Sequence, residues 1–227
     1  MLRPPKAVRR EPRARVAIVT CGALVVGLRG LLAEHQWSAD VYAIDALYHL
    51  RPEKIPDAAR TLLQEIHDRY EEVVLLYGDC GTRGELDHVL DEFGATRPPG
   101  MHCYQMLLDD SYADLVDRSP GVFFLTPWLI RNWERAVLRP LGLLEHPELR
   151  ENYFAHITQV VYVDWPPKSQ LVDEARAIAA WLEHPLAIAF SNGGTIASHL
   201  ARAFDRLKAA EAQASERPTG GRGARAS

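Results

Sequence analysis

The sequence predicts an α/β protein with three layers, in which a mostly parallel sheet carries helices on both faces. Two observations predict this class. Short runs of aliphatic and β-branched residues alternate along the 227 residues with longer segments whose apolar residues recur at helical spacing. The short runs are almost continuously apolar, which is typical of strands buried on both faces. Strands that alternate with helices are joined by crossover connections, so we expect them to run parallel.

Six runs are predicted to be strands, and most are followed by a polar or glycine-containing turn. They are Arg15–Thr20, Asp40–Leu47, Val73–Tyr77, Gly121–Thr126, Thr158–Val163 and Leu186–Phe190. Met101–Leu107, which follows the Pro/Gly loop Ala95–Gly100, is a further candidate strand.

The segments between these runs are predicted to be helices. Pro56–Tyr70 keeps its apolar residues on one helical face, and Pro56 suits a first helical turn. Gly84–Phe93 is a short helix closed by Gly94. The other predicted helical segments are Gly22–His35, Leu107–Arg118, Trp128–Leu138, Leu141–Tyr153, Gln170–Glu183 and Ile196–Leu207.

One α/β domain is expected over residues 15–207, between a disordered basic leader (1–14) and a disordered tail rich in Ala, Glu, Arg and Gly (208–227). The basic start and the apolar run Val16–Leu28 also fit a signal peptide. We favour a first strand, because Arg29 stands where a cleavage site needs small residues. The run is also too short to span a bilayer.

Composition narrows the function classes. A net charge of −4 gives no reason to expect a nucleic-acid partner, and no membrane span is predicted. The 3 cysteines lie far apart in the chain, which argues against a secreted disulfide framework. A reducing cytoplasm is therefore the expected location.

The three cysteines are the main candidates for chemistry. Cys21 and Cys80 follow predicted strands and each precedes a glycine, while Cys103 lies beside His102 in GMHCYQML. Carboxyl ends of parallel strands share one rim, where ligands bind, so we expect the three thiols to gather there. Three thiolates suit zinc or a [4Fe–4S] cluster with one labile iron. The alternative is that each cysteine is a small buried apolar residue.

Neighbouring residues extend this candidate site. His102 is a candidate fourth metal ligand, although in an extended segment it would point away from Cys103. Asp79 is a candidate base, or else a turn residue next to Gly78. Helices predicted to begin after Cys21 and Cys80 would lower the pKa of both thiols.

Further candidates lie after the second and fifth predicted strands. His49 and Glu53 are expected to handle protons or substrate, and Arg51 and Lys54 to hold an anionic group; the alternative is an ordinary charged loop. Thr126 and Trp128 are candidate pocket walls, and Asn192–Thr195 is a candidate anion site or an ordinary helix cap.

The histidines on predicted helices and connectors are interpreted as surface residues. They are His67, His88, His146, His156, His184 and His199.

Several motifs together resemble one family. They are CGAL after the first strand, HLRPEKI after the second, YGDCGT after the third, and HCY and FFLTPW further on. In this order they resemble the domain of unknown function 1638 family, over about Arg15 to Leu207. The resemblance implies a bacterial or archaeal α/β protein, often found beside corrinoid-dependent methyltransferase systems. Corrinoid methyl-transfer proteins are therefore expected partners, and one-carbon transfer an expected setting.

Three functional hypotheses follow. The first is an enzyme or accessory protein whose Cys21, Cys80 and Cys103 bind a metal ion or cluster. The second is metal-free thiol chemistry, with Cys80 as a nucleophile activated by His102 or His49. The third is a non-catalytic module that carries a metal or small ligand to a partner.

Overall fold

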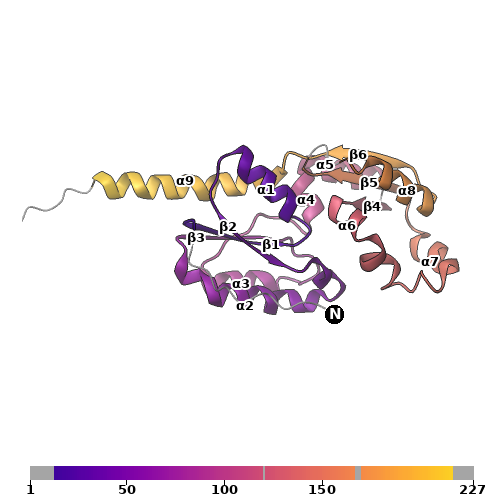
Figure 1. Cartoon of the computed structure of the whole chain (residues 1–227), viewed down its shortest axis with the longest axis horizontal. Coiled ribbons are helices and arrows are strands. Elements are labelled where there is room, and N and C mark those ends of the chain that lie inside the picture. The colour runs from indigo at the N-terminus through magenta and orange to yellow at the C-terminus, as the bar shows by residue number, and fades with distance from the viewer. Residues whose placement is uncertain (1–12, 120, 167–169, 217–227) are drawn as a thin grey trace, which may run out of the picture.

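The computed structural model describes residues 13–119, 121–166 and 170–216. Its strands are parallel and alternate with helices, which confirms the predicted α/β class. The strands form two three-stranded sheets, ordered β2-β1-β3 and β4-β5-β6, where the sequence suggested one (Figure 1). We call the halves built on these sheets the first and second units.

The first unit has three layers. Its strands are β1 (Val16–Cys21), β2 (Asp40–Ile44) and β3 (Glu72–Leu76). β1 is buried along its whole length because it lies between two strands and beneath helices on both faces. Figure 1 shows one pair of helices on each face of the sheet. One face carries α1 (Val25–Glu34) and α9 (Gly194–Glu216), and the other carries α2 (Ile55–Ile66) and α3 (Glu85–Phe93).

The second unit is joined to the first through one face of its sheet. Its strands are β4 (Val122–Leu125), β5 (Gln159–Asp164) and β6 (Leu186–Phe190). Successive side chains of a strand point to opposite faces. Val161 and Val163 therefore enter the core of the first unit, while Val160 and Tyr162 enter a separate core beneath α8 (Val172–Leu182).

The helix α9 connects the end of the second unit back to the first. Ile196, Leu200 and Phe204 pack into the core of the first unit. His199 on the same helix is buried, so its interpretation as a surface residue is wrong. The helix continues to Glu216, through the start of the segment predicted to be disordered; residues 1–12 and 217–227 lie outside the described residues.

Near the site, local structure departs from prediction in two places. The candidate strand Met101–Leu107 is instead the helix α4 (Cys103–Leu108), preceded by an extended His102. The strand predicted to reach Leu47 ends at Ile44, where Asp45 caps a 3₁₀ helix, Ala46–Leu50, by accepting the N–H of Leu47.

The remaining elements are short helices. Three are α helices, namely α5 (Asp110–Arg118), α6 (Pro127–Arg131) and α7 (Arg150–Phe154). The others are a π helix at Glu134–Leu138 and 3₁₀ helices at Pro52–Lys54, His67–Arg69 and Pro147–Leu149. Within the described ranges, no helix combines the length and apolar character needed to cross a membrane.

Candidate functional site

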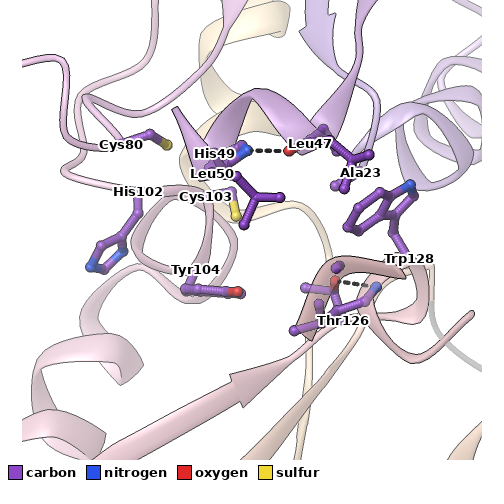
Figure 2. Close-up of a pocket in the computed structure, with 13 residues that line it drawn as sticks. Ala23, Leu47, His49, Leu50, Cys80, His102, Cys103, Tyr104, Thr126 and Trp128 are labelled. Atoms are coloured by element: carbon purple, nitrogen blue, oxygen red, sulfur yellow. Dashed lines mark hydrogen bonds between the residues drawn. The ribbon is translucent and has the colours of Figure 1, made fainter. Parts of the chain in front are cut away.

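A small pocket lies where the carboxyl ends of the first sheet meet the second unit (Figure 2). Its volume is about 190 Å³. Apolar side chains form most of the wall, namely Leu47, Leu50, Tyr104, Trp128 and Leu129. The polar side chains at the pocket are His49, Cys80, His102, Cys103 and Thr126. The site therefore combines two thiols and two imidazoles with an apolar interior.

The loop after β3 presents Cys80 to this pocket. Cys80 has a positive φ of 49°, a conformation that residues with a side chain rarely adopt. The loop is held against the segment before α4, because the N–H of Cys80 donates to the carbonyl of Met101 at 2.7 Å. Gly78 lies against the backbone of His102, where an added Cβ would come within 2.5 Å of its Cα. Tertiary contacts thus stabilise the strained position of Cys80.

Asp79 holds this loop in shape. Its carboxylate accepts hydrogen bonds from three backbone N–H groups and one hydroxyl, those of Gly81, Arg83, Gly84 and Thr82. Burial alone would raise the pKa of Asp79, but these hydrogen bonds outweigh it and lower the pKa below its usual value. With its oxygens engaged in this way, the geometry favours the turn role over that of a base.

His49 is held beside Cys80. Its Nδ1 lies 2.8 Å from the carbonyl of Ala46, so Nδ1 carries a proton and donates it, which leaves Nε2 as the free nitrogen. The ring stacks on Tyr77 at 5.5 Å between centroids. Burial alone would lower the pKa of His49. The hydrogen bond and charge interaction with the Cys80 sulfur raise this pKa by more, so the net shift is upward. His49 and Cys80 therefore form an interacting pair at the pocket.

The other two thiols are in a different environment. Cys21 is 2% exposed, and burial raises its thiol pKa to about 11, although the N–H of Ala23 donates to its sulfur. The expectation that a following helix lowers this pKa is wrong, because α1 begins only at Val25 and burial dominates. Burial, and then the charges of Cys80 and Cys21, raise the pKa of Cys103 well above its usual value. Both thiols therefore stay protonated.

Tyr77 lies among the three cysteines. Its hydroxyl is buried and has no hydrogen-bond partner of ordinary geometry in the described part of the chain, although the Cys21 thiol interacts with it. Burial and the charges of all three sulfurs raise the pKa of Tyr77. The thiols are thus near enough to influence one group. Among the described residues, however, no three Cys, His, Asp or Glu side chains are arranged to hold one metal ion.

His102 is directed away from the cysteines. Figure 2 shows its ring on the far side of the α4 start from the Cys103 sulfur. Its Nε2 lies 2.9 Å from the Tyr112 hydroxyl, and its Nδ1 is buried without a partner. Burial lowers the pKa of this imidazole. Of the two histidines proposed to activate Cys80, the geometry favours His49.

The other sequence-predicted residues divide between wall and surface. Trp128 lines the pocket, and Thr126 lines it while its Oγ1 accepts the N–H of Leu129 at 3.3 Å and caps α6. Three of the charged residues, namely Arg51, Glu53 and Lys54, are exposed and do not line the pocket.

The segment Ser191–Thr195 has a structural role at the start of α9. The Ser191 hydroxyl donates to the carbonyl of Leu107 at 2.7 Å, and the Thr195 hydroxyl donates to that of Met106 at 3.1 Å. The N–H of Gly194 donates to the Asn192 side chain. These bonds fasten α9 to α4, which favours the cap interpretation over an anion site.

Sequence reasoning missed Tyr77 and Tyr104. Tyr104 stacks on Phe124 at 4.8 Å and lines the pocket. Each is adjacent to a predicted site segment, Tyr77 before Gly78 and Tyr104 after Cys103, and this adjacency was the available signal.

These features define an α/β protein with a small apolar pocket that presents a paired cysteine and histidine at the strand ends. The chain belongs to the family described as "Protein of unknown function (DUF1638)", whose pattern matches residues 43–200. This is the family that the motifs resemble. No curated protein matches the chain.

Proposed function

We propose that this protein is a thiol enzyme in which Cys80 is the nucleophile and His49 its acid–base partner. The pairing of these two side chains at the pocket carries the proposal, since the charge and hydrogen bonding of Cys80 raise the pKa of His49. Reactive cysteines have an accessible sulfur beside a cationic or hydrogen-bonding group. Cys80 meets both conditions, whereas Cys21 is sealed in the core.

The chemistry follows from the geometry of the pair. The Cys80 thiolate gives an electron pair to an electrophilic carbon of the substrate, and an S–C bond forms. The leaving group departs with its bonding pair and takes the proton from Nε2 of His49. Neutral His49 then removes a proton from an incoming water or acceptor, which displaces the bound group and restores the thiolate. The Ala46 carbonyl keeps Nδ1 protonated throughout and fixes the ring.

A labelling experiment tests the pair. Iodoacetamide alkylation is followed at each cysteine by peptide mass spectrometry in the wild type and in His49→Gln. We expect alkylation of Cys80 near neutral pH to slow by about tenfold or more, because the thiolate loses its cationic partner. His146→Gln, at an exposed histidine outside the pocket, is the matched control. An unchanged rate at Cys80 in His49→Gln would remove the proposal.

A second experiment tests group transfer. p-Nitrophenyl acetate offers an activated carbonyl carbon and a coloured leaving group. The proposal expects a burst of p-nitrophenolate and one acetyl group on the Cys80 peptide, both absent in Cys80→Ser. A reactive Cys80 that never acquires an acetyl group would instead favour the non-catalytic binding module.

A second candidate is a thiolate metal site at Cys21, Cys80 and Cys103, acting in methyl transfer with corrinoid proteins as the resemblance suggests. One observation favours it: the charges of all three sulfurs act on the buried Tyr77 hydroxyl, which has no ordinary hydrogen-bond partner. The side chains would have to turn toward one another to share a metal. Elemental analysis of protein purified without oxygen, with each cysteine changed to alanine in turn, decides between the candidates. Metal lost in each of the three variants would support this site.

A further inference from the structure

Of the residues that the structure describes, those lining the pocket include no acidic or basic side chain apart from two histidines. The side chains that line it are aliphatic, aromatic, thiol, hydroxyl or imidazole. His49 already interacts with Cys80 and with the Ala46 carbonyl, and burial lowers the pKa of His102, which keeps that ring neutral. Among the described residues, the pocket wall therefore offers no lysine or arginine to hold a carboxylate or a phosphate. Placing an anion in such an apolar space without a partner is costly.

The volume sets the size of the group that the pocket can enclose, since the pocket is partly open to solvent. A space of about 190 Å³ is slightly larger than the engineered cavities of roughly 150 Å³ that hold benzene. Trp128 and Leu50 form part of this wall and suit a flat or aliphatic body. One ring and a few further atoms would fill the pocket.

Tyr104 supplies the polar contact within this wall. Its ring is fixed by stacking on Phe124, and Figure 2 shows its hydroxyl directed across the pocket toward Thr126. Thr126 Oγ1 already accepts the N–H of Leu129. Burial raises the pKa of Tyr104 well above its usual value, so the hydroxyl keeps its proton. It is therefore a hydrogen-bond donor directed at the space that a ligand would fill.

We propose that the pocket takes a small neutral carbonyl compound with an apolar, ring-sized body, whose carbonyl oxygen accepts a hydrogen bond from Tyr104. The proposal rests on the proposed function in one respect only: it places an electrophilic carbon in the pocket that Cys80 shares. Tyr104 orients the carbonyl, and the apolar wall selects against charged analogues of the same shape.

Three probes that thiols do not attack test this proposal by calorimetry on the full chain. Benzamide and benzoate have nearly the same shape and differ in charge, and biphenyl-4-carboxamide adds a second ring. We expect benzamide to bind at least about tenfold more tightly than benzoate, because the carboxylate would be desolvated without a partner. We expect biphenyl-4-carboxamide to bind no more tightly than benzamide, because the pocket cannot enclose its second ring. Equal affinity for benzoate overturns the charge argument, and tighter binding of the longer amide than of benzamide overturns the size argument.

The variant Tyr104→Phe tests the hydrogen bond. We expect benzamide to bind about five- to tenfold more weakly, the usual effect of losing one neutral hydrogen bond. Tyr153→Phe, at an exposed tyrosine of α7, is the matched control. Unchanged benzamide affinity in Tyr104→Phe removes Tyr104 from the proposal. Alkylation of Cys80 is measured separately, so loss of the reactive pair and loss of ligand selectivity are told apart.

Discussion

Cys21 and Cys80 have the same local sequence pattern and very different surroundings. Each follows an apolar run and precedes a glycine. Cys21 is the last residue of β1 and pairs with Ile44 of β2 in the sheet, where it is buried. Cys80 lies beyond the end of β3, in a left-handed conformation at the pocket. The comparison teaches that the exposure of the thiol depends on how far the cysteine lies beyond the end of its strand, because a thiol still within the sheet is enclosed by the core.

The largest expected effect is the difference in labelling rate between these two thiols. With a pKa of about 11, Cys21 is a thiolate in roughly one molecule in several thousand near neutral pH. We expect iodoacetamide to label Cys80 at least about a thousandfold faster than Cys21 in the folded protein. In concentrated guanidinium the two rates should converge. Fast labelling of Cys21 in the native state would break the comparison.

A second, smaller effect is expected from Gly78→Ala. Its new Cβ would lie 2.5 Å from the Cα of His102, so the Cys80 loop or the start of α4 must move. We expect unfolding by urea to show a loss of about 2–3 kcal/mol, typical of overpacking, and Cys80 labelling to change several-fold.

Gly94→Ala is the control for this substitution. Gly94, unlike Gly78, has a positive φ, of 60°, but it has no atom within 4 Å of an added Cβ and it ends α3. It should lose about 1 kcal/mol and keep the wild-type labelling rate at Cys80. If both variants label Cys80 equally, the Gly78 contact does not position the thiol.

The same contrast explains what the sequence could predict. The strand runs, their parallel order and the α/β class follow from apolar periodicity, which is a local property. The sequence offers Met101–Leu107 only as a candidate strand, and helix α4 lies there instead, because CYQMLL is a short apolar run and such runs do not distinguish a strand from a buried helix. The partnership of His49 with Cys80 links segments far apart in sequence, and only the folded sheet brings them together.

Helix α9 shows the opposite limit. Composition predicts a disordered tail from Lys208 onward, yet the helix continues to Glu216. The sequence predicts a surface position for His199, because nothing in it shows that α9 returns to the first unit. Long-range packing decides the burial of His199, and composition does not report it. The turns after Leu207 are exposed where the structure describes their side chains, so their helical state does not depend on core packing.

A third prediction concerns Asp79, the residue that shapes the Cys80 loop. In Asp79→Asn an NH2 group replaces one carboxylate oxygen. This group is a donor, so the backbone N–H groups that it faces lose their acceptor. We expect a loss of about 1–2 kcal/mol in urea unfolding and slower labelling of Cys80. Cys21 labelling should not change. Asp91→Asn, at an exposed position of α3, is the control. Wild-type stability in Asp79→Asn would show that the loop does not depend on this carboxylate.

The Asp79 carboxylate also makes the stability of the folded protein depend on pH. The pKa of Asp79 is lowered in the folded state, so the unfolded chain binds a proton at higher pH than the folded one. Its stabilising contribution is present above the unfolded pKa of about 3.9 and is lost as pH falls through the folded value. Urea unfolding at a series of acidic pH values should show this loss in the wild type and not in Asp79→Asn.

The smallest effect on the two thiols is expected from His199, which lies on α9. Its Nε2 lies 3.0 Å from the Thr96 hydroxyl, and Arg202 approaches its Nδ1. Burial, followed by the charges of Arg202 and Arg206, lowers its pKa to about 4, while Glu72 opposes the shift. In the unfolded chain the pKa is about 6.5. Between these values the unfolded state binds a proton that the folded state does not, so stability falls as pH decreases across this window.

His199→Gln separates this global effect from the local one. Glutamine keeps a hydrogen-bonding group for Thr96 but does not titrate, so the fall in unfolding free energy between about pH 6.5 and 4 should flatten. The ratio of Cys80 to Cys21 labelling in the folded protein should stay at its wild-type value, because neither thiol contacts α9 through this histidine. A change in that ratio would mean that α9 controls the pocket. An unchanged slope with pH would mean that other groups take up the proton.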